Sequence, residues 1–405
     1  MGVASVRDPG CGLSEVLALG IWSTALAVSV APICPPGFTS ALSWTRTRNT
    51  TSDRRRFRQR IEPFDPGPDY RIPYELGNDY WLYSRYCGLA CGEDKTLVIG
   101  DSVVWGEYVT PQDTLPHHLN SLSAPGRFVN LGVDGIHPAA MSGLIAYYAR
   151  AIRGRNVVLH FNPLWMSSKR HDLQTNREFQ FNHPTLVPQF VPWIPCYRES
   201  YANRIGIVIE RYLPFRAWTN HLATAYFENT DLATWARENP YSNPLAKITL
   251  ELPKPSPDLR HKPVPWTETV GAPVDFEWVD LASSIQWRSF QQTVRTLRAR
   301  GNHVFVVVGP FNEYMIKEQQ IEPYNAIKNG IDIWLEEQRI PHYVPPKLPS
   351  GLYADASHPL GKGYALIAEQ ILQDDSFRHF LEGEKRQVNA KNYDRPRSAM
   401  PPQDG

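Results

Sequence analysis

Short and almost uninterrupted hydrophobic runs recur along the middle of the chain, and segments with helical spacing separate them. A run without polar alternation is typical of a strand that a parallel sheet buries on both faces. The predicted strands are Thr96–Ile99, Arg127–Leu131, Asn156–Phe161, His303–Val308 and a weaker one at Pro341–Val344. The predicted helices are Ala139–Arg153, Leu281–Arg300, Ile316–Gln338 and Lys362–Leu372. This alternation predicts an α/β sandwich with a mostly parallel sheet.

A long stretch between the third and fourth strands divides the predicted core. The core takes up residues 61–163 and 286–383, and residues 164–285 lie between them. This stretch is far longer than a strand–helix–strand crossover needs, and it contains six of the twelve tryptophans. We therefore expect a folded, aromatic-rich insert. It is either a lid or substrate subdomain, or a structural subdomain that packs its own aromatic side chains.

The two ends of the chain differ in composition from the core. Residues 1–60 contain an uncharged run at Val16–Ile33, which predicts a signal peptide or membrane anchor and an extracytoplasmic protein. Seven arginines between residues 46 and 60 favour a cytoplasmic side for the chain after that run, so a cytoplasmic location and a disordered start are alternatives. Residues 35–70 are rich in Pro, Arg, Ser and Thr and predict a linker, and residues 384–405 predict a disordered tail.

Charge and cysteine content narrow the range of partners. The net charge is +1, so no overall field favours nucleic acid. The cysteines are Cys11, Cys34, Cys87, Cys91 and Cys196. Cys87 and Cys91 could form a disulfide or remain two buried thiols, and a zinc site on this pair lacks two further ligands at suitable spacing. We therefore expect neither a nucleic-acid partner nor a metal ion.

Residues suited to acyl-transfer chemistry follow the predicted strands. Ser102 follows the first strand, Gly135 the second, Asn162 the third, and Asp355 and His358 the fifth. Because the carboxyl ends of parallel strands meet at one edge of a sheet, we expect these residues to lie close together. Acyl transfer needs a hydroxyl nucleophile, an imidazole base, an orienting carboxylate and donors for the oxyanion. Ser102, His358 and Asp355 match the first three, and the amides of Ser102, Gly135 and Asn162 could supply the fourth.

The same residues also have structural interpretations. Ser102 could cap the N-terminus of the helix that follows it, and Asp355 and Ser357 could cap the helix that begins near Gly361. Other catalytic motifs are absent from the sequence. Ser102 is not part of G-x-S-x-G, because Val104 takes the last position, and no H-E-x-x-H zinc motif occurs. The nucleophile elbow of the α/β-hydrolases is therefore excluded.

Four short blocks, GDSVVWG, NLGVDG, FN and DASHPLGKGY, occur in this order along the chain. They resemble the four blocks of the SGNH/GDSL hydrolase family, which centre on Ser, Gly, Asn and His, with Asp in the last block. The resemblance covers about residues 95–163 and 302–380. It implies a three-layer α/β/α sandwich with a flavodoxin-like, parallel, five-stranded sheet. It further implies a catalytic triad of Ser102, Asp355 and His358, with Ser102, Gly135 and Asn162 as oxyanion-hole donors.

The third block departs from the family pattern. The usual Gly-x-Asn-Asp is replaced by residues 160–163, His-Phe-Asn-Pro. Asn312, in the later stretch GPFNE, is therefore a second candidate for the amide donor. Asp101, His160, Asn312 and Glu313, together with His137, are expected to border the pocket.

These observations predict a metal- and cofactor-independent serine hydrolase of the SGNH type. We expect it to remove an acyl group, such as acetyl, from an O-acylated carbohydrate or a lipid ester through an acyl-enzyme on Ser102. An O-acyltransferase that passes the acyl group to a polysaccharide with the same triad is one alternative. A glycan-binding protein with an inactive site is the other.

Overall fold

A computed structural model describes residues 67, 69–92, 95–248, 252–254, 259–269 and 271–382. The uncharged run at Val16–Ile33, Cys11 and Cys34, most of the predicted linker and the tail 384–405 lie outside these described residues. Tyr70, at the end of the predicted linker, is buried in the core. In the part of the chain that the structure describes, no helix has the length and apolar character needed to cross a membrane.

Strands and helices alternate through the core, and shorter helices make up the insert. The strands are β1 (Thr96–Ile99), β2 (Phe128–Asn130), β3 (Asn156–Phe161), β4 (His303–Val308) and β5 (His342–Tyr343). The core helices are α3 (Tyr80–Ala90), α4 (Ser102–Trp105), α5 (Leu115–Leu122), α6 (Pro138–Tyr147), α12 (Ile285–Ala299), α13 (Glu318–Glu337) and α14 (Gly361–Gln373). The insert helices are α7 (Tyr201–Glu210), α8 (Pro214–Tyr226), α9 (Leu232–Glu238), α10 (Pro244–Lys247) and α11 (Trp266–Thr269). Single 3-10 turns are η1 (Tyr74–Leu76), η2 (Pro111–Asp113), η3 (Pro163–Met166), η4 (Glu313–Met315) and η5 (Ser350–Leu352).

The five strands form one parallel sheet in the order β2-β1-β3-β4-β5. This is the flavodoxin-like order, in which the sheet grows in opposite directions from the switch point between β1 and β3. Every residue of β1 and β3 is buried, which explains why their sequences show no polar alternation. The predicted parallel α/β sheet is confirmed.

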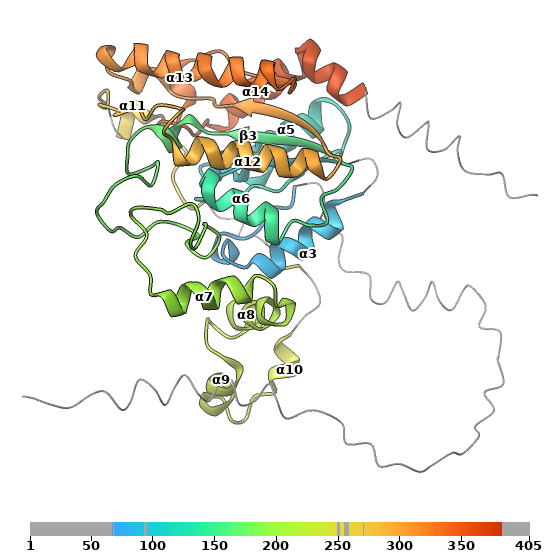
Figure 1. Cartoon of the computed structure of the whole chain (residues 1–405). Helices are drawn as coiled ribbons and strands as arrows, with labels where there is room; N and C mark the ends of the chain where they lie inside the picture. Colours follow the sequence, from blue (N-terminus) through green and yellow to red (C-terminus); the bar gives the residue numbers. More distant parts are fainter. Residues whose placement is uncertain are drawn as a thin grey trace, which may run out of the picture. The chain divides into compact units, whose positions relative to one another are not determined.

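Helices cover both faces of the sheet and complete three layers (Figure 1). Successive side chains of a strand point to opposite faces, so Leu97 and Ile99 join one hydrophobic core and Val98 joins the other. The first core includes side chains of α3, α6 and α12, and the second includes side chains of α5 and α14. This packing fixes the strands and leaves their carboxyl ends, with the loops that follow, at one edge.

The described part of the insert divides its hydrophobic side chains among three clusters. Leu186 and Val187 pack into the core that contains α6, and Trp266 packs into the core that contains α14. Leu222, Phe227 and Trp235 form a small cluster of their own. The described insert therefore has a small hydrophobic cluster of its own, and other parts of it pack on the α/β core.

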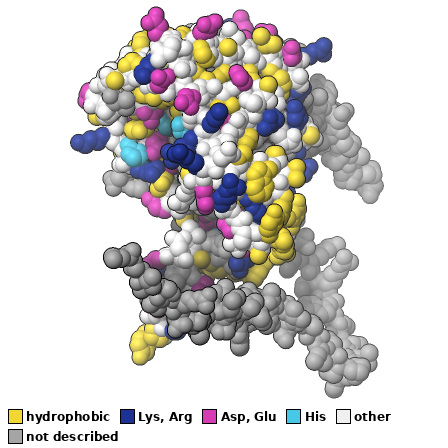
Figure 2. Space-filling model, turned by 60° about the vertical axis from the view of Figure 1, so that its left-hand side comes forward, with side chains coloured by type: hydrophobic (Ala, Val, Ile, Leu, Met, Phe, Trp, Pro, Cys, Tyr) yellow, Lys and Arg dark blue, Asp and Glu magenta, His cyan; other side chains and the backbone are white. Residues whose placement is uncertain are grey.

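Helices α7 and α8 expose a series of large hydrophobic side chains. Tyr201, Ile205 and Ile209 follow one another at intervals of four along α7, and Phe215 and Trp218 lie on α8. Figure 2 shows a dense group of hydrophobic side chains on one face of the molecule. Residues four apart lie on the same side of a helix, so the exposed residues of α7 form a stripe rather than scattered points.

Candidate active site

The loops that follow the five strands carry the predicted site residues. Ser102 follows β1, Gly135 follows β2, Asn162 follows β3, Asn312 follows β4 and Asp355 follows β5. Ligand sites of open α/β sheets form at this carboxyl edge, next to the switch point of the strand order. The topology therefore brings all five loops to the edge at which chemistry is expected.

Ser102 is the first residue of the one-turn helix α4. Asp101 caps this helix, because its Oδ1 accepts the N–H of Val103 at 3.1 Å. At the other end, the buried guanidinium of Arg71 donates to the carbonyl of Gly106 at 2.6 Å. The interpretation of Ser102 as the helix cap is therefore wrong. Its hydroxyl is held on a helix that is fixed at both ends.

The Ser102 hydroxyl meets the ring of His358. Ser102 Oγ lies 2.8 Å from His358 Nε2, although the two residues are 256 positions apart. The other ring nitrogen, Nδ1, lies 2.9 and 2.8 Å from the two carboxylate oxygens of Asp355. Asp355 Oδ1 also accepts the backbone N–H groups of Ser357 and His358 at 2.9 Å, so it closes a tight turn. This geometry lets a hydroxyl proton pass to a ring whose orientation the carboxylate holds.

The charges around His358 stabilise its protonated form. Burial alone would lower the pKa of His358, but the charge and hydrogen bond of Asp355, with the charges of Asp101 and Glu107, raise it to about 9. Burial opposes the ionised form of Asp355 as well, but His358 keeps the pKa of Asp355 below its ordinary value. At neutral pH the pair is therefore a carboxylate beside an imidazolium. The ring can act as a base only after it loses a proton, which happens as the pH rises towards the pKa of His358.

The backbone N–H groups of Ser102 and Gly135 have no acceptor among the described residues. Gly135 has a φ of +66°, a conformation that favours glycine, and a Cβ there would lie 2.3 Å from Nδ2 of Asn182. No hydrogen bond within the described residues engages the Gly135 N–H. The Ser102 N–H lies at the start of α4, where helix geometry supplies no acceptor. Both can donate to an incoming oxygen.

Asn162 is held by Asp101. Asn162 Nδ2 donates to Asp101 Oδ2 at 2.9 Å, which leaves the second N–H of the amide for another acceptor. The indole of Trp165 donates to the same oxygen at 2.9 Å, and His160 Nδ1 lies 3.2 Å from Oδ1. Burial alone would raise the pKa of Asp101, but the neighbouring His160 ring and the hydrogen bonds from Asn162 and Trp165 lower it to about 2. Asp101 is therefore a buried anion that orients Asn162.

The other predicted pocket residues have structural contacts. Asn312 Nδ2 donates to the Asp355 carbonyl at 3.1 Å, so it supports the turn that carries the carboxylate. Glu313 pairs with Lys328 at 2.8 Å. His137 caps α6, and burial lowers its pKa to about 3.

A charged group beside His358 was not predicted from the sequence. Arg260 Nη1 lies 3.1 Å from Glu107 Oε1 and 3.2 Å from Asp134 Oδ2. Burial and the neighbouring Glu107 carboxyl raise the pKa of Asp134 to about 7, against the opposing charges of Arg260 and His358. Tyr108 lies next to this group, with its ring centre 5.4 Å from that of His358. We call Glu107 and Asp134 the acidic rim of the site. Arg260, which belongs to the insert, pairs with both of these carboxyl groups.

The insert also contacts the peptide that carries the Gly135 N–H. His183 Nε2 donates to the carbonyl of Asp134 at 3.1 Å, and its Nδ1 lies 3.1 Å from the Tyr80 hydroxyl. Burial lowers the pKa of His183, which favours the neutral ring that accepts from Tyr80 and donates to the carbonyl. The carbonyl of Asp134 and the N–H of Gly135 belong to one peptide group, so His183 fixes the plane of that donor.

The described cysteines are free. Cys87 and Cys196 are buried and Cys91 is half-buried, and Cys91 Sγ donates to the carbonyl of Ala151 at 3.6 Å. A Cys87–Cys91 disulfide is therefore not what the structure contains. Across the described ranges, no group of three or more His, Cys, Asp or Glu side chains is arranged to hold a metal ion.

Comparison with known proteins adds no relative to this description of the site. No protein-family model matches the chain, and no curated protein matches it.

Proposed function

We propose that the protein is a serine ester hydrolase of the SGNH type, in which Ser102, His358 and Asp355 form the catalytic triad. One observation carries the proposal: Ser102 Oγ lies 2.8 Å from His358 Nε2 while Asp355 holds the opposite nitrogen of the ring. A serine, a histidine and a carboxylate in this order are the parts that acyl transfer requires. The substrate class is an O-acylated carbohydrate or another ester.

The proposed reaction proceeds in two steps. In the first, Ser102 Oγ attacks the ester carbonyl, His358 Nε2 takes the hydroxyl proton, and the N–H groups of Ser102, Gly135 and Asn162 stabilise the oxyanion. The carbonyl–oxygen bond then breaks, and His358 returns the proton to the leaving alcohol. In the second, water attacks the acyl-enzyme with the same ring as base, which releases the acid and restores the serine.

Phosphonylation tests which serine is the nucleophile. We expect an alkyl fluorophosphonate to label the full-length protein on Ser102, because the oxygen attacks phosphorus, fluoride leaves and His358 takes the proton. Peptide mass spectrometry locates the label. The matched control is Ser357→Ala, which removes a buried hydroxyl with no hydrogen-bond partner among the described residues and which should still be labelled. Label on any residue other than Ser102 would contradict the assignment.

Glu107, on the acidic rim, should contribute to the pH at which the enzyme becomes active. The base must be neutral to accept a proton, and the pKa of His358 is about 9. We therefore expect kcat/KM for a small ester to increase with pH, and the apparent pKa of this rising limb to lie near 9. At that pH the Asp134 carboxyl, whose pKa is raised to about 7, is ionised. Glu107→Gln removes one of the charges that raise the pKa of His358, so the limb should move to lower pH by up to about 1 unit.

The control for this shift is Glu313→Gln, whose carboxylate pairs with Lys328 and is not among the largest charges that act on His358. Its pH profile should match that of the unmodified protein. An unchanged limb in Glu107→Gln, or equal shifts in both variants, would show that Glu107 does not contribute to the pKa of the base.

A further inference from the structure

A cavity of about 700 Å³ lies between the insert and the N-terminal part of the core. Its walls come from residues 74–81, residues 180–185 and the helices α7 and α8, with Asp134 and Tyr148 completing them. We call this space the insert cavity. Its size falls within the range of small-molecule sites, roughly 300–1,000 Å³.

The insert cavity adjoins the proposed oxyanion hole. Asp134 lines the cavity, and Gly135, the next residue, supplies one of the proposed donors. Asn182 and His183, which also line the cavity, bond the carbonyls of Gly135 at 3.3 Å and Asp134 at 3.1 Å. A ligand in the cavity therefore contacts the same turn that would hold the reacting carbonyl.

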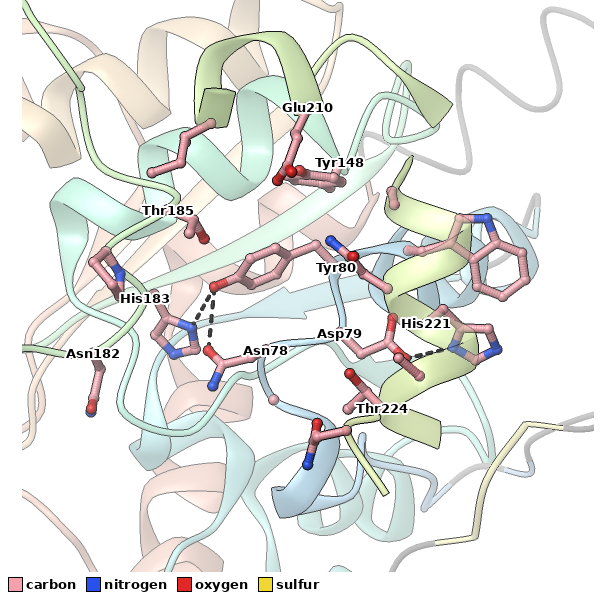
Figure 3. A pocket seen from close by; sticks show the side chains of 18 of the residues that line it. Asn78, Asp79, Tyr80, Tyr148, Asn182, His183, Thr185, Glu210, His221 and Thr224 are labelled. Carbon is pink, nitrogen blue, oxygen red and sulfur yellow. Dashed lines mark hydrogen bonds and ion pairs between the residues drawn. The ribbon is translucent and has the colours of Figure 1, made fainter. Parts of the chain in front are cut away.

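Most charged side chains in the cavity wall have partners within the protein, whereas the Glu75 carboxylate has none among the described residues. Asp79 and His221 form a buried pair at 2.5 Å, seen as a dashed line in Figure 3. The guanidinium of Arg211 donates to the carbonyl of Thr185 at 3.0 Å, and Glu210 pairs with Arg216 at 2.9 Å. Because these charges are satisfied within the protein, a ligand need not bring a charge.

Neutral polar groups in the wall are left for a ligand. The hydroxyls of Tyr148 and Thr224 and the amides of Gln180 and Asn220 line the cavity and make no side-chain hydrogen bond within the described residues. Figure 3 shows Tyr148, Thr224 and Thr185 placed around one space from different elements, with Tyr80 between them. Hydroxyls and amides both donate and accept, which suits a ligand whose own hydroxyls do the same.

We infer that the insert cavity binds the neutral, polyhydroxylated part of the substrate, a carbohydrate, while Ser102 attacks an acyl group on it. This inference rests on the proposed function. Of the two alternatives for the insert, it makes the part that carries α7 and α8 a substrate subdomain rather than a purely structural one. The acyl ester would lie beyond Asp134, on the side of the cavity nearest Gly135, and the sugar ring would contact the amides and hydroxyls of the wall.

Binding without turnover tests the cavity separately from the reaction. The full-length protein with Ser102→Ala is titrated calorimetrically with acetylated xylo-, manno- and chito-oligosaccharides, and with an acetylated oligogalacturonate as the anionic comparison. At least one neutral oligosaccharide should bind, and the anionic one should not. Adding Tyr148→Phe and Thr224→Val should weaken binding about tenfold, because two hydrogen bonds are lost.

The matched control is Thr219→Val on the same helix, whose hydroxyl donates to the Arg216 carbonyl. It should leave binding unchanged. Failure of every neutral oligosaccharide to bind, or equal binding by the cavity variant and the control, would overturn the inference. Hydrolysis of p-nitrophenyl acetate by the unmodified protein is measured in parallel. Its absence beside intact binding would overturn the proposed reaction and leave the cavity as a carbohydrate site.

Discussion

Replacing Ser102 with alanine is expected to lower the rate of p-nitrophenyl acetate and butyrate hydrolysis by roughly 10⁴- to 10⁶-fold. A methyl group cannot attack the carbonyl, and the remaining donors at Gly135 and Asn162 act only on an oxyanion that a nucleophile has formed. The fold should survive, because the Ser102 side chain bonds only His358 in the described structure and alanine has the highest helix propensity. Steady-state kinetics and thermal unfolding measure the two effects.

Ser357→Ala is the matched control for that loss. It removes a serine hydroxyl from the same turn as Asp355 and His358, and that hydroxyl is buried without a partner in the described part of the chain. Activity should stay within about twofold, since no group of the proposed reaction changes. If Ser102→Ala kept a tenth or more of the unmodified rate, another residue would have to be the nucleophile.

The hydrophobic runs predicted the sheet because its strands are buried on both faces. The bounds of β1, β3 and β4 match the predicted runs, and β2 and β5 are one residue shorter at each end. Helix ends were less predictable. The helical pattern beginning at Ala139 continues to Arg153, but α6 ends at Tyr147. Ala149 and Ile152 are buried although they follow the end of the helix. The helical spacing of hydrophobic residues therefore continues past the last residue of α6.

Two core helices were not predicted, and their composition explains why. Helix α3 contains four aromatic residues and Gly88, which have low intrinsic helix propensity. Its stability comes from packing, since Leu82, Tyr83 and Tyr86 are buried in the core. Helix α5 is only eight residues long and begins with Leu-Pro, so its sequence resembles a loop.

The site residues that could be predicted are those whose partners lie close to them in the sequence. Asp355 and His358 are three residues apart, and the turn that joins them is encoded in that spacing. The roles of Asp101 and His183 were not predictable in this way. Asp101 bonds Asn162 and Trp165, more than 60 positions away, and His183 reaches the Asp134 carbonyl only because the insert folds back onto the core. Such contacts depend on tertiary packing, which no short pattern in the sequence records.

Asp355→Asn should lower kcat by about 10⁴-fold, the loss that the same change causes in a serine-protease triad. In the unmodified protein, Asp355 Oδ1 accepts the backbone N–H groups of Ser357 and His358 at 2.9 Å. The amide oxygen of asparagine can accept the same two groups, so this turn should persist. The amide NH₂, however, can face Nδ1 of the ring as a donor. It then favours the tautomer with the proton on Nε2, which cannot accept the proton of Ser102.

The same change should move the pH dependence of the residual activity. Asp355 is the largest of the charges that raise the pKa of His358 to about 9. Without that charge the imidazolium is less stable, so the neutral ring forms at lower pH. The rising limb of kcat/KM, followed from about pH 5 to about pH 10, should shift towards the ordinary histidine value of roughly 6.5.

A second Asp–His pair in the chain provides the comparison. Asp332 Oδ1 lies 2.8 Å from His342 Nε2, so Asp332→Asn removes a carboxylate from a histidine by the same chemical change and should alter neither kcat nor the pH limb. A loss of rate in Asp355→Asn with the limb unmoved would show that the carboxylate orients the ring without tuning it. A limb that shifts while kcat stays within a few-fold would show that the ring keeps its catalytic tautomer without Asp355, and the orienting role assigned to this carboxylate would be wrong.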